Sequence, residues 1–350
     1  MFRLPSVKIE IPYFKSWVTG ALAGAVAGVT VVGGIFACLN DVDISESVKN
    51  DKGEVIVDIP MGTAGVQIPA LLEKNGIDVN AFFFKVALRL TGADRNFHAG
   101  YYSFSDKDTV FSMTRRIADG DVVILSWRLS DGATQWELRR SLNEMDGVKH
   151  DSAQMSADEI LLAIGATESH LEGLFAPDTY KFKAGVSDLK VLKKAYDRQK
   201  TILGIEWDAR SPDCVVKTPY EALILASIIE REVGRPQDRL IVSGIFSNRL
   251  RVKMPLQTDP SVMYGEGEEF EGRLRKKHLN RRTPYNTYRF VGLPPTPIGN
   301  PTRESIYAAL HPAKTDYIYF INKDNGDLVP NKTLEEHNKA VDLYIRKKGQ

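Results

Sequence analysis

The spacing of apolar and polar side chains predicts an α+β chain with two successive folded regions. In residues 55–130, strand-like alternation and helical periodicity follow one another, which is typical of a small α+β module. The expected strands are 54–60, 101–104 and 122–129, and the expected helices are 65–75, 80–91 and 109–119. Residues 131–350 have mostly helical periodicity with few strands, which predicts a larger, mixed α+β domain.

Two stretches of the second domain have little periodicity and many polar residues. In the second domain as a whole, the expected helices are 134–145, 156–164, 188–203, 218–234, 236–251 and 301–310. A strand is expected at 317–322, a hairpin turn at 325–326 and a last helix from 333. Residues 256–265 and 282–292 are expected to be irregular or short-stranded. Because connecting segments of this kind commonly carry binding residues, we place candidate substrate contacts there.

The longest apolar run lies near the N-terminus. Residues 18–39 carry no charge and are rich in Gly, Ala and Val, and a spanning helix needs about 20 such residues. Basic residues precede the run and acidic residues follow it, so the positive-inside rule places residues 1–17 in the cytoplasm. We therefore predict a single transmembrane helix, a linker at 40–54 and a body outside the cytoplasm.

Two alternatives to an uncleaved span exist. A cleaved signal peptide has a shorter apolar core than residues 18–39. The tetrad ending at Cys38 resembles a bacterial lipoprotein cleavage site with Cys38 as the lipidated residue, although Phe36 fits that pattern poorly. The length of the run favours the uncleaved span.

The helix expected at 218–234 has signals at both ends. Thr218 is suited to cap it, Pro219 suits the first helical position, and Glu221 completes a capping box. Gly234 is expected to end the helix in the left-handed conformation. Nearly every side chain between these ends is apolar, which predicts a helix buried on most sides.

Glu230 is the candidate catalytic residue on this helix. Its apolar surroundings predict a raised pKa, which a glutamic acid needs if it is to donate a proton near neutral pH. A structural alternative is an ion pair with Arg231 or Arg249. Glu232 is the rival candidate, and the residues alone barely separate the two glutamates.

Charge and cysteine usage exclude several classes of protein. The formal net charge is +1, which gives no sign of the broad basic surface that nucleic-acid binding requires. The two cysteines, Cys38 and Cys214, are expected to be unpaired, and no His or Cys cluster has zinc spacing. We expect no metal and no cofactor.

Several motifs in order resemble the endolytic murein transglycosylases, the YceG-like family. They are His98-Ala-Gly-Tyr-Tyr-Ser-Phe104, Glu172-Gly-Leu-Phe-Ala-Pro-Asp-Thr-Tyr180, Ser227-Ile-Ile-Glu-Arg-Glu232, Phe246-Ser-Asn-Arg-Leu250, Leu256-Gln-Thr-Asp-Pro-Ser-Val-Met-Tyr-Gly265, Thr283-Pro-Tyr-Asn-Thr-Tyr288 and Gly292-Leu-Pro-Pro295. The resemblance runs from about residue 55 to the C-terminus.

The resemblance implies a bacterial inner-membrane enzyme that cuts nascent peptidoglycan glycan strands and leaves a 1,6-anhydro-muramyl end. It gives Glu230 the position of the catalytic glutamate and makes residues 55–130 LysM-like. It also implies a partnership with penicillin-binding proteins. A lytic transglycosylase needs one carboxyl group, because the 6-hydroxyl of the muramyl sugar attacks its own anomeric carbon.

Seven further side chains are candidates for gripping or positioning the sugar. Amides offer hydrogen bonds to hydroxyl or acetamido groups, tyrosines offer ring faces, and the residues of the helix at 236–251 are candidates for orienting Glu230. Asp259 suits an oxocarbenium-like centre, or caps the turn before Pro260. The candidates are Asn248, Arg249, Gln257, Asp259, Tyr264, Asn286 and Tyr288.

Two other functions remain open at this stage. A muramidase that uses water would need Asp259 as its second carboxylate. A glycan-binding scaffold would need no chemistry, and Glu230 closed off in an ion pair would favour this alternative. A carboxyl group without a partner in an open groove would favour the enzyme.

Overall fold

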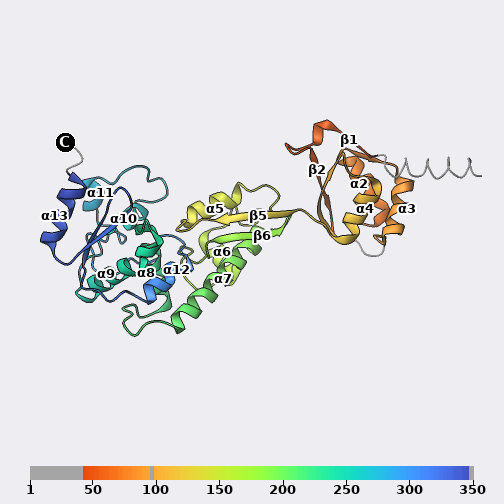
Figure 1. Cartoon of the computed structure of the whole chain (residues 1–350). Coiled ribbons are helices and arrows are strands. Elements are labelled where there is room, and N and C mark those ends of the chain that lie inside the picture. Colours follow the sequence, from red (N-terminus) through yellow and green to blue (C-terminus); the bar gives the residue numbers. More distant parts are fainter. Residues whose placement is uncertain (1–41, 95–97, 347–350) are drawn as a thin grey trace, which may run out of the picture. The chain divides into compact units, whose positions relative to one another are not determined.

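A computed structural model describes residues 42–94 and 98–346 of the 350-residue chain (Figure 1). The chain divides into two compact units between Ile124 and Leu125, a few residues before the predicted boundary at 130. The predicted cytoplasmic head and transmembrane helix, residues 1–39, lie outside the described residues. Within the described residues, no helix has both the length and the apolar character that a membrane span requires.

The first unit contains two pairs of antiparallel strands packed against three helices. β1 (Val42–Ile44) pairs with β3 (Ile77–Val79), and β2 (Glu54–Ile59) pairs with β4 (Gly100–Ser105). The helices are α2 (Ile68–Lys74), α3 (Ala81–Thr91) and α4 (Val110–Asp119), with short 3-10 turns η1 (Glu46–Val48) and η2 (Gly65–Gln67). The predicted strands and helices of this region are present, but the sequence predicted neither β1 nor β3, and the LysM-like character stays a prediction.

The predicted linker at 40–54 is wrong for its described part. β1 lies in it, and the Ile44 side chain is only 4% exposed in the core of the first unit. The polar residues of the stretch concealed this short strand, because the sequence could not show its pairing with β3.

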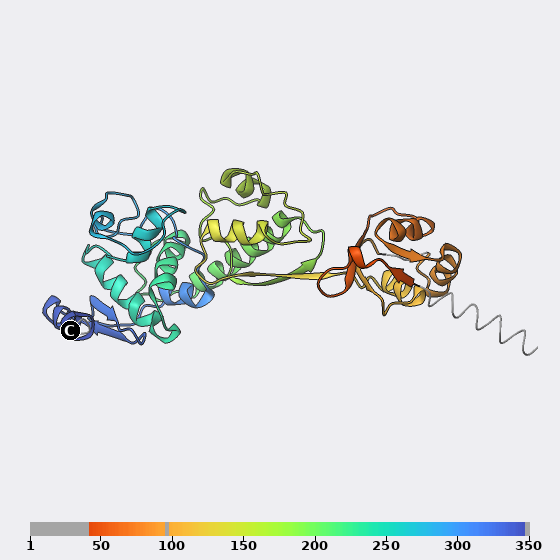
Figure 2. The same ribbon diagram turned by 90° about the horizontal axis from the view of Figure 1, so that it is seen from above.

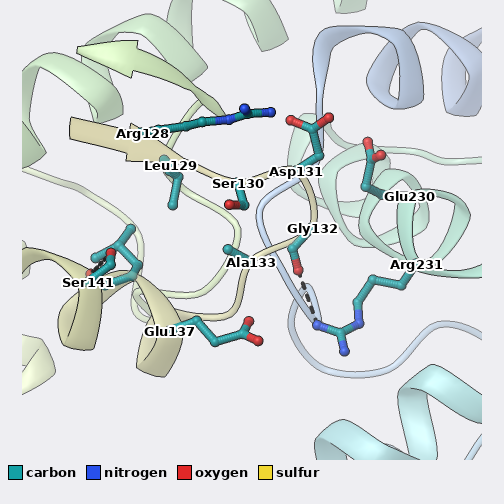
Figure 3. A pocket seen from close by; sticks show the side chains of 11 residues that line it. Arg128, Leu129, Ser130, Asp131, Gly132, Ala133, Glu137, Ser141, Glu230 and Arg231 are labelled. Atoms are coloured by element: carbon teal, nitrogen blue, oxygen red, sulfur yellow. Dashed lines mark hydrogen bonds between the residues drawn. The ribbon is translucent and has the colours of Figure 1, made fainter. Parts of the chain in front are cut away.

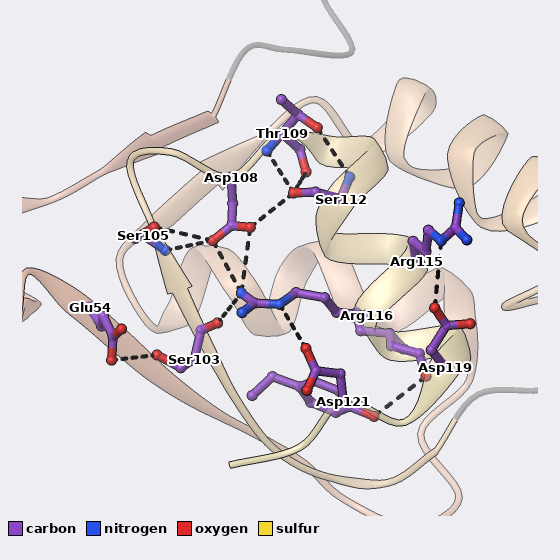
Figure 4. Close-up of polar contacts among 12 residues, drawn as sticks. Glu54, Ser103, Ser105, Asp108, Thr109, Ser112, Arg115, Arg116, Asp119 and Asp121 are labelled. Atoms are coloured by element: carbon purple, nitrogen blue, oxygen red, sulfur yellow. Dashed lines mark hydrogen bonds and ion pairs between the residues drawn. The ribbon is translucent and has the colours of Figure 1, made fainter.

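A partly exposed polar network holds helix α4 against strand β4. Arg116 donates to the carbonyl of Ser103 at 2.7 Å and forms ion pairs with Asp108 and Asp121 (Figure 4). Asp108 also accepts from the backbone N–H of Ser105. One guanidinium therefore fixes the helix, the strand and the turn between them.

The second unit begins with a two-stranded sheet and its helices. β5 (Ile124–Leu129) pairs with β6 (Asp178–Lys183). Beside them along the chain lie α5 (Gln135–Asn143), α6 (Ala157–Ile164) and α7 (Asp188–Asp208). The helices that follow along the chain are α8 (Pro219–Glu232), η3 (Pro236–Asp238), α9 (Arg239–Arg251), α10 (Asp259–Gly265), α11 (Lys276–Asn280) and α12 (Arg303–Leu310).

The C-terminal part of this unit is a hairpin with a helix packed on it. β7 (Tyr319–Asn322) pairs with β8 (Leu328–Asn331), and α13 (Leu334–Tyr344) contacts both strands, as the blue end of the ribbon in Figure 2 shows. The predicted hairpin turn and the predicted Thr333 cap are confirmed. The stretch expected to be irregular at 256–265 instead contains helix α10.

Helix α8 is the centre of the second unit. Its residues from Ala222 to Ile229 are all buried, and it packs against α12, α7, α9 and α10. The Thr218 hydroxyl accepts from the N–H of Glu221, as predicted. The predicted left-handed stop is wrong: Val233 caps the helix in an extended conformation (φ −91°), and Gly234 is not left-handed.

The helix ends instead in extended backbone at Val233 and Arg235, and the chain bends at Gly234 before it enters η3. Gly244 of α9 faces the 313–315 segment. A Cβ at Gly244 would come within 2.5 Å of the carbonyl oxygen of Ala313. This glycine therefore allows the 313–315 segment to lie on α9.

Candidate functional site

Glu230 is fully engaged in the interior of the second unit. Its side chain is 5% exposed and forms an ion pair with Arg239, the first residue of α9, at 2.9 Å. Its other carboxyl oxygen accepts from the backbone N–H and the hydroxyl of Thr302, at 2.9 and 2.5 Å. Thr302 caps the N-terminus of α12, so Glu230 joins three helices.

These contacts shift the pKa of Glu230 in the direction opposite to the predicted one. Burial favours the neutral form, but the hydrogen bonds from Thr302 and the charge of Arg239 outweigh it, so the pKa of Glu230 is lowered. The expectation of a raised pKa is wrong. No residue near Glu230 in the sequence indicates Thr302 as a partner, and the ion pair forms with Arg239 and not with Arg231 or Arg249, the partners of the structural alternative.

Glu232, two residues later, has different surroundings. Burial and, second, the negative charge of Asp259 raise the pKa of its carboxyl group to about 7, against the opposing cation of Arg249. The residue is half-buried, and its carboxyl group has no hydrogen-bond or ion-pair partner within the described chain. Its carboxyl oxygens also keep some exposure to solvent. Glu232 is thus a reachable carboxyl group that is about half protonated near pH 7.

Three of the predicted substrate contacts lie around Glu232. The Tyr288 hydroxyl donates to Asp259 at 2.7 Å, and burial together with this bond raises the pKa of Tyr288. Arg249 is 5% exposed and donates to the carbonyls of Ile318 and Leu256, while its charge acts on Glu232. The structure therefore brings Arg249, Asp259 and Tyr288 together, beside Glu232 and not beside Glu230.

Gln257 also belongs to the segment next to Asp259. Its backbone has φ +53°, a left-handed value that is uncommon for a residue other than glycine. Its side chain is exposed, and its N–H donates to the carbonyl of Thr287. The exposed amide is free to meet a ligand beside Asp259.

Two predicted contacts are used within the fold. The Asn286 amide is 1% exposed and donates to the carbonyls of His278, Leu279 and Arg281. The Asn248 amide donates to the carbonyls of Thr315 and Tyr317. These amides bind backbone, and we leave both residues out of the proposed site.

Tyr264 lies in a separate buried cluster with Glu172. Its ring stacks on Trp136 at 4.9 Å between centroids and meets Tyr285 edge-on. Burial raises the pKa of Glu172 to about 7, against the N–H of Gln135 and the hydroxyl of Tyr264, which lower it. Glu172 is only 1% exposed, so it has the acidity of a general acid without access to a substrate.

A cavity of about 480 Å³ lies on the Glu230 side of helix α8. Figure 3 shows its charged lining, with Arg231 turning its guanidinium to the carbonyl of Gly132 at 3.1 Å. The charged lining residues are Arg128, Asp131, Glu137, Glu230 and Arg231. Because Glu230 stays ionised there, this cavity holds no proton donor supplied by α8.

Comparison with known proteins identifies the family. A model of the YceG-like family matches residues 57–343, most of the chain. The chain belongs to the YceG-like family. The resemblance carried by the sequence motifs is thereby confirmed.

Relatives in this family carry a common name. An endolytic murein transglycosylase of Bacillus subtilis (strain 168) is 33% identical over 342 residues, 91% of this chain and 92% of the relative. One of Streptococcus pneumoniae is 23% identical over 333 residues, and the match spans 60% of that protein. The crystal structure of a yceG-like protein from Listeria monocytogenes has a TM-score of 0.52 at 29% identity, covering 82% of this chain and 99% of that one.

Within this YceG-like domain, one signal in the sequence could have separated the two glutamates. Residues two apart on a helix point to nearly opposite sides. Glu230 shares its face with Leu223 and Ser227, which are buried, whereas Glu232 is the last residue of the helix. A carboxyl group at the end of an apolar helix is the one that can be half-buried and reachable.

Proposed function

We propose that the protein is an endolytic peptidoglycan transglycosylase in which Glu232 is the single general acid and base. The observation that carries the proposal is the half-buried Glu232 carboxyl group, which has no hydrogen bond or ion pair in the part of the chain that the structure describes and a pKa of about 7. Glu230, which the sequence favoured, is held as a carboxylate by Thr302 and Arg239 and cannot donate a proton at neutral pH.

Protonated Glu232 donates its proton to the glycosidic oxygen between the muramyl sugar and the next sugar, and that bond breaks. The resulting carboxylate takes the proton of the muramyl 6-hydroxyl, and the 6-hydroxyl oxygen bonds to the anomeric carbon. The product is a 1,6-anhydro end and a free 4-hydroxyl on the other fragment. A pKa near 7 suits both steps, because the same group must release and accept a proton.

The neighbours of Glu232 have roles in this scheme. The Asp259 charge keeps the pKa of Glu232 high before the reaction and faces the positive charge that develops at the sugar ring. Tyr288 fixes Asp259 through its hydroxyl, and Gln257 offers its exposed amide to the sugar. Arg249 is the cation that favours the carboxylate form after proton transfer.

The setting of the enzyme is proposed from the sequence. A single span at 18–39 would hold the protein in the bacterial inner membrane with both units outside the cytoplasm. The first unit would contact glycan as a LysM-like module, and penicillin-binding proteins would supply the nascent strands.

The test uses the full chain in detergent with un-crosslinked glycan and mass spectrometry of the fragments. Wild type is expected to yield internal fragments with anhydro ends. Glu232→Gln should reduce the rate about 10²- to 10⁴-fold, since it removes the proton donor. Glu230→Gln is the matched control, and its folded fraction should retain most of the activity.

The outcomes separate the alternatives. Cleavage by Glu232→Gln, with loss in well-folded Glu230→Gln, would return the catalytic role to Glu230. Reducing ends in place of anhydro ends would mean a muramidase, and the charge of Asp259 beside Glu232 makes it the second carboxylate of that reaction. Glycan binding without cleavage by any form would mean a scaffold.

A further inference from the structure

A basic patch lies on and around helix α11. The stretch 272–282 carries six basic residues and no acidic one, although the net charge of the whole chain is only +1. All six side chains are exposed, and we define the basic patch as Arg273, Arg275, Lys276, Lys277, Arg281 and Arg282.

Most of this charge is not neutralised by the protein. Arg281 forms an ion pair with Glu266, and the other five basic residues have no ion pair within the described chain. Glu268, from the acidic stretch that precedes the patch, is paired instead with Arg140 of α5. Glu269 and Glu271 precede the patch along the chain, but neither forms an ion pair with it in the described chain. An exposed cluster of like charges of this kind is positioned to attract an anionic ligand.

The patch is tied to the loop that carries Tyr288. Asn286 donates to the carbonyls of His278, Leu279 and Arg281 at the end of α11. Arg289 donates to the carbonyl of Leu279 and to the side chain of Asn280. Residues on both sides of Tyr288 are thus bonded to α11, and Tyr288 itself binds Asp259 next to Glu232.

We propose that the basic patch binds the carboxylates of the peptide stems on the glycan strand as the strand lies in the site. This inference rests on the proposed function and adds a second point of recognition. The stems carry negative charge along the substrate, and lysine and arginine bind carboxylates through charge-assisted hydrogen bonds. A patch one loop away from the acid would meet the stems of sugars flanking the cleaved bond.

The experiment compares the full chain with Lys276→Gln/Lys277→Gln on glycan that carries stems and on glycan stripped of them. KM for stem-bearing glycan should rise about three- to tenfold at low salt, because two exposed charges near an anion are lost. The kcat should stay unchanged, and stripped glycan should show no difference. Lys190→Gln/Lys194→Gln, an exposed lysine pair on α7, is the matched control and should behave as wild type.

Equal KM changes on both glycans, or none on either, would overturn the proposal. Vesicles containing phosphatidylglycerol test the other anionic surface: loss of vesicle binding with an unchanged KM would assign the patch to the membrane instead. If wild type cleaves nothing, equilibrium binding of stem-bearing glycan by the two forms still measures the patch. Failure of the proposed chemistry is therefore distinguishable from failure of the patch.

Discussion

The two faces at the end of helix α8 treat a glutamate in opposite ways. On one face, Glu230 meets Thr302 and Arg239 and is held as a carboxylate. On the other, Glu232 has no side-chain partner among the described residues, and burial raises its pKa to about 7. Burial alone therefore does not make a carboxyl group a general acid, because hydrogen-bond donors can reverse the effect of burial on its pKa.

The contacts also assign different work to the two faces. Glu230 joins α8, α9 and the cap of α12, so it stabilises the arrangement of the helices. Glu232 contributes no such bond among the described residues, and in the proposed reaction it exchanges its proton with the substrate. The first face is expected to govern stability, and the second is expected to govern activity.

The largest effect on stability is expected for Glu230→Gln. Removing this charge leaves Arg239, whose side chain is 15% exposed, without its counter-charge. We expect the free energy of unfolding of the second unit to fall by about 3 kcal/mol, the cost typical of breaking a buried ion pair from one side. Denaturant titration of the full chain, followed by a probe of the second unit, measures the change.

Glu232→Gln is the matched control for that experiment. It removes a carboxyl group that has no hydrogen bond or ion pair in the described chain, so its stability should equal or exceed that of wild type. Equal losses in both variants would contradict the division between a structural and a catalytic face.

Sequence reasoning recovered the elements whose signals are local. The Thr218 and Thr333 caps and the alternation of 54–59 each predicted an element correctly, because neighbouring residues decide them. It failed where the deciding partner is distant: Thr302 lies 72 residues from Glu230, and strand β1 depends on β3. The motif Ser227–Glu232 indicates helix α8, but only the packing around this helix distinguishes Glu230 from Glu232.

Glu172 is a third carboxyl group to compare with these two. Its pKa is raised like that of Glu232, but its side chain is sealed from solvent. Its pKa of about 7 lies above the ordinary 4.5, so the folded state holds a proton that the unfolded state has released between these values. Stability from this group is therefore full below pH 4.5 and is lost as pH rises toward 7, by roughly 2–3 kcal/mol. Denaturant titrations at pH 5 and pH 8 measure the loss.

Glu172→Gln should remove about half of the measured pH dependence, because a neutral amide has no proton to lose and Glu232, whose pKa is also raised to about 7, keeps its own share. It should leave the pH dependence of activity unchanged, since Glu172 is 1% exposed and reaches no substrate. A shifted pH–activity profile in Glu172→Gln would show that the sealed carboxyl group acts on the chemistry.

The smallest expected effect comes from Asp259→Asn, which tests why Glu232 is a weak acid. Burial is the main cause of its raised pKa, and the charge of Asp259 is the second. Removing that charge should lower the pKa of Glu232, so the alkaline limb of the plot of kcat/KM against pH moves to lower pH by less than one unit. Tyr288→Phe is the matched control, because it removes the hydroxyl bonded to Asp259 and keeps the charge. If Asp259→Asn lowered the rate equally at every pH and left the limb in place, Asp259 would act on the substrate and not through the acidity of Glu232.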